Sequence, residues 1–407
     1  MRVVIVGAGA LGTAAAYHGQ KAGHEVTLLD AGGVAGETTG YAAGILSTGI
    51  VHDHDRRLVR LTMEGLERLE EAHPRAGADT GPLLRRPGSH LVARDGPEGR
   101  IIPLIADGCA ALGVEHEILS GSEWADGMAR RGVEAAAHDV GLVLSLPQDA
   151  WSLSTDATDL MARAAKAEGI RIRTMTRVDR LLLDTDSSGP SPVVRIGGVL
   201  LADGTRIEAD RVIVAMGAWT RTFLAAHGLR LPAQCFRTHA AILETPHAEA
   251  MPIVHDDPNG YYLRPEGPRH LLVGNGTRTE PIPSDGFTHD AEPSFLDSIA
   301  LVVPRRFPGL ATAGLGRAWK GLLTGTPDRA PLMGPHPDAE GLHILTGGNG
   351  YGFMRSFALG ACAAAFLDDG DAPDGLPPDI LGRLSVARFW PEPPESFPVR
   401  EGFTLEP

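Results

Sequence analysis

The chain has 407 residues, a charged fraction of 22% and a formal net charge of −14, so it is long enough for two domains or one elaborated α/β domain. The acidic balance argues against sequence-independent binding to nucleic acid, and no apolar run approaches the roughly 20 residues that span a bilayer. The N-terminal pattern lacks the features of a signal peptide, and we expect a cytoplasmic protein.

Three cysteines, Cys109, Cys235 and Cys362, are spread widely along the chain. An odd number at such spacing fits neither a disulfide framework nor a Cys-x-x-Cys metal or redox site. We therefore expect reduced and largely buried thiols.

The first thirty residues predict a strand, a helix and a second strand. Residues 2–7 are apolar, largely β-branched and end in glycine, which is typical of a buried parallel strand. A helix is expected over residues 9–23 and the next strand over residues 25–30. This order is that of a βαβ unit.

Gly7, Gly9 and Gly12 have the spacing of the dinucleotide-binding fingerprint. In that motif the first glycine permits a tight turn, the second lets a pyrophosphate approach the backbone, and the third lets the helix pack close to the strand. Asp30 follows at the end of the second strand, where a carboxylate can accept hydrogen bonds from an adenosine ribose. It would repel a ribose phosphate, which disfavours NADP, whereas NAD and FAD both fit.

The middle of the chain adds further strands. A helix over residues 156–168 leads into a strand over residues 170–174. Residues 193–215 are rich in strands and hairpin turns, and residues 211–217 read as a buried strand that ends in glycine. From residue 237 to 277, extended segments broken by Pro and Gly predict an antiparallel sheet in a separate domain.

Near the end, residues 341–348 return to the buried-strand pattern and residues 353–367 predict a helix. The chain is therefore expected to be α/β, with a discontinuous Rossmann-like dinucleotide-binding domain and a second, antiparallel-sheet substrate domain; the resemblance described next makes the first an FAD-binding domain. The predicted ranges are 1–82, 150–222 and 317–370 for the first domain, 83–149 and 223–316 for the second, and 371–407 for a Pro-rich C-terminal tail over the surface.

Several segments carry a family resemblance in the correct order. They are Gly36-Glu-Thr-Thr-Gly-Tyr-Ala-Ala-Gly-Ile45, residues 212–219, residues 319–328 with 331–334, and Thr346-Gly-Gly-Asn-Gly-Tyr-Gly-Phe-Met354. These segments resemble the flavin-contacting loop, the second dinucleotide strand, the return to the flavin domain and the isoalloxazine loop of the D-amino-acid oxidase superfamily of FAD-dependent oxidoreductases. The resemblance implies FAD rather than NAD.

The fingerprint and the resemblance together predict the cofactor contacts. They are Gly7, Gly9, Ala10, Leu11, Gly12, Asp30, Ala31, Thr38, Thr39, Ala42, Ala43, Gly44, Ile45, Val178, Gly217, Trp219, Gly321, Gly348, Asn349, Gly350, Tyr351, Gly352, Phe353 and Met354. A helix that begins after residues 350–352 would direct backbone N–H groups and a positive dipole end at the flavin pyrimidine.

The resemblance also implies that the flavin is bound without a covalent link. Some relatives attach it to a cysteine in the segment that corresponds to residues 319–328, or to a histidine in the first loop. The matching positions in this chain are Gly321 and Tyr41. We therefore expect non-covalent FAD.

The reaction implied by the resemblance is oxidation of a C–N bond of an amino acid or N-substituted amine by hydride transfer to flavin N5. The alternatives are an FAD-dependent 2-hydroxy-acid dehydrogenase on the same scaffold and a non-catalytic flavin-binding subunit. The electron acceptor, whether oxygen, a quinone or a partner protein, and the oligomeric state are left open by the sequence.

The substrate clamp of the relatives is missing. They place a carboxylate-binding arginine at the position of Leu323, or a lysine near the position of Met354. Arg57, Arg264 and Arg355 are the candidate substitutes, because a guanidinium can bind a carboxylate in two parallel hydrogen bonds.

Other side chains are also candidates for the catalytic site. Tyr262 is expected to share a strand face with Arg264 in a context that resembles a substrate-contacting strand of the family. Lys320, next to a predicted flavin contact, carries an ammonium that would favour superoxide during oxygen attack. Tyr351 lies within the isoalloxazine loop.

The run His52-Asp-His54-Asp offers imidazole and carboxylate ligands. No third well-spaced ligand group accompanies it, and alternating polar residues suit an exposed loop, so no metal site is predicted. Its position just after the flavin loop favours a polar contact with substrate instead.

Overall fold

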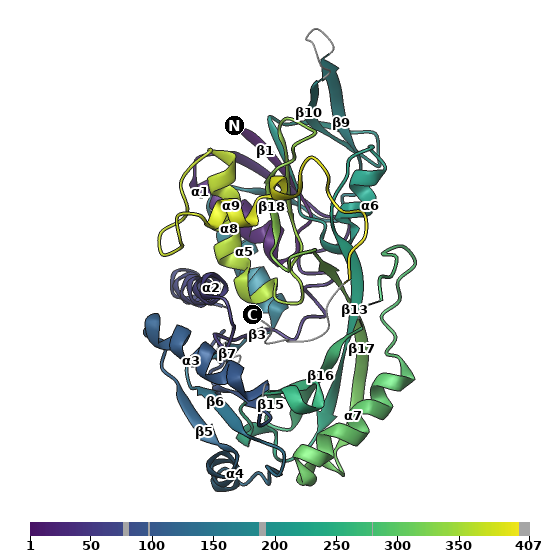
Figure 1. The fold of residues 1–407 in the computed structure, drawn as a ribbon. Coiled ribbons are helices and arrows are strands. Elements are labelled where there is room, and N and C mark those ends of the chain that lie inside the picture. The colour runs from purple at the N-terminus through teal and green to yellow at the C-terminus, as the bar shows by residue number, and fades with distance from the viewer. Residues whose placement is uncertain (76–80, 97, 187–192, 279, 399–407) are drawn as a thin grey trace.

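The computed structural model describes residues 1–75, 81–96, 98–186, 193–278 and 280–398. Two large sheets, each with its own helices, make up most of the molecule, and the chain crosses between them several times (Figure 1). None of the helices in the described ranges is both long and apolar enough to cross a membrane.

The first sheet has six strands in the order β18-β19-β12-β1-β2-β8, parallel except for the pair β18 and β19. Their bounds are β1 (Arg2–Val6), β2 (Glu25–Leu29), β8 (Arg171–Arg173), β12 (Arg211–Val214), β18 (Leu332–Pro335) and β19 (Leu342–Thr346). The strand order reverses beside β1, and ligands of open α/β sheets bind at such a reversal, beyond the carboxyl ends of the strands.

Both faces of this sheet are covered, which explains the continuous apolar runs of its strands. Val3 and Ile5 pack with the helices on one face, while Val4 and Val6 pack with a three-stranded antiparallel sheet on the other. The helices are α1 (Ala10–Lys21), α2 (Asp53–Ala72), α5 (Ser154–Ala167) and α8 (Ser356–Leu367), and the small sheet contains β9 (Val178–Asp186), β10 (Val193–Leu201) and β11 (Arg206–Glu208).

The second sheet has eight strands in the order β17-β13-β16-β15-β14-β4-β6-β5. All neighbours are antiparallel except β14 and β4. The bounds are β4 (Ser89–Ala93), β5 (Glu117–Ser120), β6 (Leu142–Leu146), β13 (Gln234–Glu244), β14 (Ile253–Asp256), β15 (Tyr261–Gly267), β16 (His270–Arg278) and β17 (Gly314–Gly325).

Helices cover this second sheet only in part. Phe295 and Trp124, on α7 (Pro293–Arg306) and α4 (Gly121–Arg130), join the core on one face, and α3 (Ile101–Ala111) covers the opposite face near β4 and β6. The long strands β13 and β17 extend toward the first domain (Figure 1). The remaining elements are the short strand pair β3 (Ile45–Leu46) and β7 (Ala150–Trp151) and the helices α6 (Thr220–Ala225) and α9 (Ile380–Leu384).

The predicted α/β class, with a Rossmann-like domain and a second domain built on a largely antiparallel sheet, is confirmed. One predicted boundary differs: β17 is a continuous strand of the second sheet from Gly314 to Gly325, so residue 317 lies inside a strand. The three cysteines are free thiols, and burial raises the pKa of Cys109 to about 11.

The prediction of a surface tail after residue 370 is wrong for residues 380–390. Ile380 and Leu384 of α9 are buried in the core of the first domain, together with the helices on its sheet. Arg388 pairs with Asp328 at 2.8 Å and holds this segment against the loop before β18. Apolar residues spaced between the prolines cause this packing; residues 399–407 lie outside the described part.

Candidate functional site

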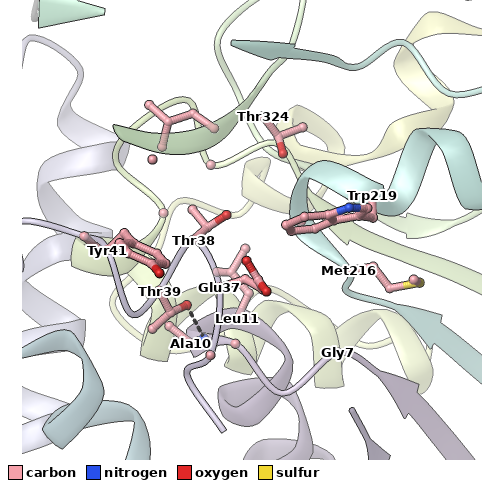
Figure 2. Close-up of a pocket in the computed structure, with 18 of the residues that line it drawn as sticks. Gly7, Ala10, Leu11, Glu37, Thr38, Thr39, Tyr41, Met216, Trp219 and Thr324 are labelled. Carbon is pink, nitrogen blue, oxygen red and sulfur yellow. Dashed lines mark hydrogen bonds between the residues drawn. The ribbon is translucent and has the colours of Figure 1, made fainter. Parts of the chain in front are cut away.

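A cavity of about 770 Å³ lies beyond the carboxyl ends of β1, β2 and β12 and reaches the second sheet. This volume is in the range of cofactor sites, about 300–1,000 Å³. The first βα turn, the loop over residues 36–45, the turn after β12, and strands β13, β15 and β17 all contribute to its wall. In the view of Figure 2, Tyr41 and Trp219 lie on opposite sides of it.

The turn after β1 fits a dinucleotide because its glycines allow close approach. Gly7 has a φ of 111°, and a Cβ there would overlap the carbonyl oxygen of Ala215. A Cβ on Gly12 would overlap the carbonyl oxygen of Gly7. Gly12 therefore does not line the cavity; it lets α1 pack against the turn, which is the role that the fingerprint assigns to it.

Helix α1 begins at the cavity wall and presents a site for an anion. Gly9 is its N-cap residue and supplies no side-chain cap, and the first turn holds no acidic residue. The backbone N–H of Ala10 donates to Thr39 Oγ1 at 3.1 Å (Figure 2). The positive end of the helix dipole is thus free of a protein carboxylate in its first turn and favours a pyrophosphate.

Asp30, directly after β2, is held in place by the backbone. Its Oδ2 accepts a hydrogen bond from the N–H of Ala8 and its Oδ1 from the N–H of Gly32, both at 2.7 Å. Each carboxylate oxygen can accept a second bond. The carboxylate lines the cavity and retains capacity for two ribose hydroxyls.

The loop over residues 36–45 is held by segments far away in the sequence. Thr38 Oγ1 donates to the carbonyl of Leu322 at 2.8 Å, and Trp319 Nε1 donates to the carbonyl of Tyr41 at 3.1 Å. Ser154 Oγ, at the start of α5, donates to the carbonyl of Thr39 at 2.6 Å. The loop is therefore fixed between the two domains.

The loop over residues 347–354 faces the same cavity. Asn349 Oδ1 accepts from the N–H of Thr326 at 2.9 Å, and Asn349 Nδ2 donates to the carbonyl of Gly347 at 2.6 Å. Gly348, Gly350 and Gly352 line the cavity wall beside it. The Asn349 side chain supplies hydrogen bonds that the backbone of this irregular loop does not make with itself. The glycine backbone is thereby held at the cavity wall.

Of the predicted cofactor contacts, only Gly12 and Tyr351 do not line the cavity. Sequence reasoning missed several lining residues, which lie on the second sheet, on and just after α6, around the start of β9, after β12 and in the loop before α7. They include Thr176, Arg177, Asp179, Met216, Thr222, Phe223, Ala226, Thr238, Ala240, Asp285 and Thr324. No local sequence pattern marks them. The alternation of β17 does predict one part of the wall, because Trp319, Gly321 and Leu323 share one face and all line the cavity.

The substrate role predicted for Arg57 is not supported. Arg57 lies on α2, where its Nη1 donates to the carbonyl of Gly375 at 3.4 Å, and it does not line the cavity. The reason is that Arg57 lies on the face of α2 that meets the C-terminal segment.

Arg264 and Arg355 are buried but bound to other protein groups. Arg264 pairs with Glu266, donates to the carbonyl of Ala43, and lies 4.0 Å above the ring of Trp151. It lines a smaller neighbouring cavity and not the main one. Burial lowers its pKa, against the attraction of Glu266. It anchors the flavin loop rather than a substrate carboxylate.

Arg355 connects the loop over residues 347–354 to α2. It forms a buried ion pair with Asp55, and its Nη2 donates to the carbonyl of Gly348 at 3.0 Å. Burial raises the pKa of Asp55, but the charge and hydrogen bond of Arg355, together with the nearby His54 and His52, outweigh it, and the pKa is lowered. Arg355 is thus a positioning residue, and the predicted clamp is wrong here as well.

Lys320 faces away from the cavity. Its neighbours Trp319 and Gly321 line the wall, so a strand side chain between them points to the opposite face. There its Nζ lies 5.2 Å from the centroid of the Phe287 ring. The predicted role next to the flavin does not fit this orientation.

The two tyrosines predicted near the substrate differ in position. Tyr262 on β15 lines the cavity, and its ring lies where a Cβ on Gly274 would be, so Gly274 makes room for it. Burial raises the pKa of Tyr262 to about 12, and that of Tyr351 to about 12. Both hydroxyls are protonated at neutral pH, but only Tyr262 belongs to the wall.

His52 and His54 lie at the start of α2, with ring centroids 5.4 Å apart in a stacked arrangement. His54 Nε2 is 3.8 Å from Asp55 Oδ2. Within the described ranges, no three His, Cys, Asp or Glu side chains gather as a metal site. Neither histidine lines the main cavity, so the predicted polar contact with substrate does not fit.

A βαβ cradle, a continuous cavity and a roofing antiparallel sheet define a dinucleotide-dependent enzyme class. The chain matches the family model DAO, described as FAD dependent oxidoreductase, over residues 2–366. It therefore belongs to this family. The prediction of FAD rather than NAD is confirmed.

Two relatives and one solved structure show how far this likeness extends. The chain is 30% identical over 91% of its length to a 4-methylaminobutanoate oxidase (formaldehyde-forming) of Paenarthrobacter nicotinovorans, but spans 44% of that protein. It is 27% identical to a D-amino acid dehydrogenase of Cereibacter sphaeroides, covering 92% of this chain and 93% of the relative. The crystal structure of L-proline dehydrogenase from P. horikoshii shares the fold, with a TM-score of 0.81, 21% identity and coverage of 95% and 97%.

Proposed function

We propose that the protein is an FAD-dependent enzyme that oxidises the C–N bond of an amino acid or N-substituted amine. One observation carries the proposal: a single cavity runs from the dinucleotide cradle at Gly7 and Asp30 to Tyr262 on the second sheet. A protein that only held the cofactor would have no need for a cavity that continues to the side chains of a second sheet. The amine and amino-acid activities named for the relatives support this class of substrate.

The residues of the cradle divide the work of holding FAD. Backbone N–H groups at the start of α1 bind the pyrophosphate, and the Asp30 carboxylate binds the ribose. The loops over residues 36–45 and 347–354 hold the ring system. When bound, FAD supplies the acceptor for the two electrons of the substrate.

The second sheet then has to orient the substrate carbon and keep water away. Tyr262 and Thr238 present polar side chains on this wall, and Leu323, at the position of the relatives' arginine, presents an apolar one. With a pKa of about 12, the Tyr262 hydroxyl can donate a hydrogen bond to the substrate across the neutral pH range. Orientation of this kind lowers the entropic part of the barrier.

Non-covalent FAD fits the two positions that carry the link in some relatives. A Cβ on Gly321 would lie 3.8 Å from the Cβ of Tyr41, so both positions meet at one point of the structure. The chain has neither cysteine nor histidine there. Acid precipitation should leave the yellow colour in the supernatant, and a coloured pellet would contradict this part of the proposal.

Anaerobic titration of the yellow holoenzyme tests the function itself. Loss of the flavin absorbance near 450 nm with amines or amino acids, but not with 2-hydroxy acids, is the expected result. Bleaching by hydroxy acids alone would replace the proposal by a hydroxy-acid dehydrogenase. If a broad panel of both classes failed to bleach the flavin, the role of a flavin-binding subunit would stand instead.

The proposal also covers the location of the protein and its electron acceptor. We propose a cytoplasmic location, which the free thiols Cys109 and Cys362 support, because such a compartment keeps thiols reduced. Oxygen or a quinone is the proposed electron acceptor, and peroxide formation on mixing with substrate and oxygen separates the two.

A further inference from the structure

Asp149, in the turn between β6 and β7, is a fully buried carboxylate that does not line the main cavity. Its described partners are hydroxyl groups and one backbone N–H, and none of them is a cation. Burial raises the pKa of Asp149, and these hydrogen bonds act against that effect. A buried carboxylate is costly, and an apolar side chain of similar size would avoid the cost. The presence of Asp149 here therefore needs a reason beyond the filling of space.

The hydrogen bonds divide evenly between the two carboxylate oxygens. Oδ1 accepts from the N–H of Thr48 at 2.9 Å and from Thr48 Oγ1 at 2.7 Å. Oδ2 accepts from Ser47 Oγ at 2.6 Å and from Ser89 Oγ at 2.5 Å. Ser47 and Thr48 directly follow β3, whereas Ser89 begins β4 of the second sheet. Asp149 therefore joins the strand that follows the loop over residues 36–45 to the second domain.

Thr48 is held from its other side by Arg56 on α2. Arg56 Nε donates to the carbonyl of Thr48 at 3.1 Å, and Arg56 Nη2 donates to the carbonyl of Ile50. The Arg56 side chain is fully buried, and a Cβ on Gly108 of α3 would lie 2.4 Å from its Nη1. The segment after β3 thus has a buried carboxylate on one side and a buried guanidinium on the other. A shift of this segment would break hydrogen bonds to both.

The turn at Asp149 also ends the short ladder between β3 and β7. Ile45 pairs with Trp151 in this ladder, and the N–H of Ser152 donates to the carbonyl of Gly44 at 2.9 Å. Gly44 and Ile45 both line the main cavity. Because a strand pair shifts in register as a unit, the hydrogen bonds at the end of the ladder fix how far these two residues reach into the cavity.

Ser89, the partner of Asp149 on the second sheet, lies beside the wall where we propose that the substrate binds. It pairs with Ile253 between the parallel strands β4 and β14. Ile253 is buried in a small apolar cluster with Ile45, and Tyr262 packs against this cluster. Asp149 is thus connected to Ile45 through β3 and to the surroundings of Tyr262 through β4.

We propose that Asp149 is a positioning residue that sets the loop over residues 36–45 against the wall at Tyr262. It acts through Gly44, Ile45 and Ser89. The role rests on the proposed function, since the placement of a substrate against the flavin matters only in an enzyme. A misplacement of about 1 Å can cost as much as about a hundredfold in rate, so a residue outside the cavity can control turnover.

Two substitutions separate the hydrogen bonds of Asp149 from its size. Asp149→Leu has a similar volume but makes none of these bonds. Asp149→Asn keeps the shape, and its amide oxygen can accept from the N–H of Thr48. Its amide nitrogen can donate to the hydroxyls of Ser47 and Ser89, because a hydroxyl also accepts. Positioning by hydrogen bonds therefore predicts a defect in Asp149→Leu and substantial rescue in Asp149→Asn.

The first measurement needs no substrate. The visible circular dichroism of bound FAD reports the surroundings of its ring system, and it is recorded at saturating FAD on protein whose far-ultraviolet spectrum is native. We expect Asp149→Leu to change the visible spectrum and Asp149→Asn to return it toward the native one. If no amine reduces the native flavin but this pattern holds, the positioning of the loop stands and the proposed function fails.

The second measurement is the limiting rate of flavin reduction by an amine that reduces the native holoenzyme, followed in anaerobic stopped flow. The rate should fall about tenfold in Asp149→Leu, with a smaller change in the Kd of the amine, because orientation rather than binding is impaired. Asp149→Asn should recover most of the rate. Ser89→Ala, which removes one donor, should show a smaller change in both readouts and supplies the test if Asp149→Leu does not fold.

Asp256→Asn is the matched control. Asp256 is also fully buried and does not line the main cavity, and it pairs with Arg306 at 2.8 Å. Its substitution should lower stability but leave the flavin dichroism and the reduction rate as they are in the native protein. Three results would overturn the role of Asp149: native dichroism and rate in Asp149→Leu, an equal change in Asp256→Asn, and no rescue by Asp149→Asn.

Discussion

The two ends of the main cavity are built in different ways. At the dinucleotide end, Gly7, Gly9 and Asp30 lie within thirty residues of one another, and the contacts are made largely by the backbone. At the other end, where we propose that the substrate binds, Thr238, Tyr262 and Leu323 come from three strands that meet only in the folded sheet. A backbone site needs a precise conformation, whereas the substrate end depends on which side chains the strands present.

The difference shows why the cofactor is easier to infer than the substrate. Few other residues can replace a glycine where φ is positive or where two backbone segments approach closely. The spacing of the glycines is therefore informative about the cofactor. An arginine has many uses, and in this molecule Arg264 and Arg355 hold the flavin loops in place instead of a substrate.

The largest expected effect concerns the ion pair that joins the loop over residues 347–354 to α2. Asp55→Asn leaves Arg355 buried without its carboxylate, at 2% side-chain exposure. Removing one partner of a buried pair costs about 3–5 kcal/mol. We expect a loss of this size in the free energy of unfolding, measured with denaturant, and faster release of FAD.

The matched control is Asp379→Asn, which breaks an exposed pair with Arg383 and should cost less than about 1 kcal/mol. Equal losses in the two variants would show that the Asp55 pair does not stabilise the junction.

The same pair predicts a dependence on pH. The pKa of Asp55 is lowered in the folded protein, because Arg355 together with the nearby His54 and His52 outweighs the effect of burial. A lowered carboxyl pKa contributes stability that is present above the unfolded pKa, about 3.9, and is lost as the pH falls through the folded value. Denaturant midpoints should fall more steeply below about pH 4 in the native protein than in Asp55→Asn; parallel curves would contradict this.

The next effect is at the dinucleotide end. Gly7→Ala places a Cβ against the carbonyl of Ala215 at a φ of 111°. Together the overlap and the strain are worth about 3 kcal/mol, roughly a hundredfold in the Kd of FAD. Fluorescence titration of the apoprotein measures it. Gly23→Ala, also at positive φ but with open space around the Cβ, should bind FAD normally.

A smaller effect is expected at the substrate end. Gly274→Ala pushes the ring of Tyr262 away, because the new Cβ would occupy its place. Since the displaced hydroxyl loses its contact with substrate, kcat/KM for an amine should fall about tenfold, with the flavin content retained. Gly267→Ala, where nothing lies within 4 Å of the new Cβ, is the control. Equal kinetics in both variants would remove Tyr262 from the substrate site.

The smallest expected effect concerns the anion site at the start of α1. Thr39→Val removes the acceptor for the N–H of Ala10 and keeps the shape of the side chain. One hydrogen bond is worth about 1 kcal/mol, so the Kd of FAD should rise about fivefold. Thr205→Val, on the exposed turn after β10, should not change it. An unchanged Kd in Thr39→Val would mean that Thr39 does not order the helix start.

The sequence by itself determined the glycine-rich βαβ turn, the α/β class and the family. This was possible because the fingerprint is local: Gly7, Gly12 and Asp30 fix the turn, the packing of α1 and the position of one carboxylate at the cavity within one βαβ unit. Strand and helix periods extend over adjacent residues in the same way.

Only the tertiary structure decided which charged side chains face the cavity. Lys320 and Trp319 are neighbours in sequence but point to opposite faces of β17, and Arg57 faces the C-terminal segment that was expected to be a loose tail. The pairing of β17 with β13 and the burial of α9 depend on contacts between residues far apart in the chain. Long-range packing sets these orientations, and a single sequence carries no local signal for it.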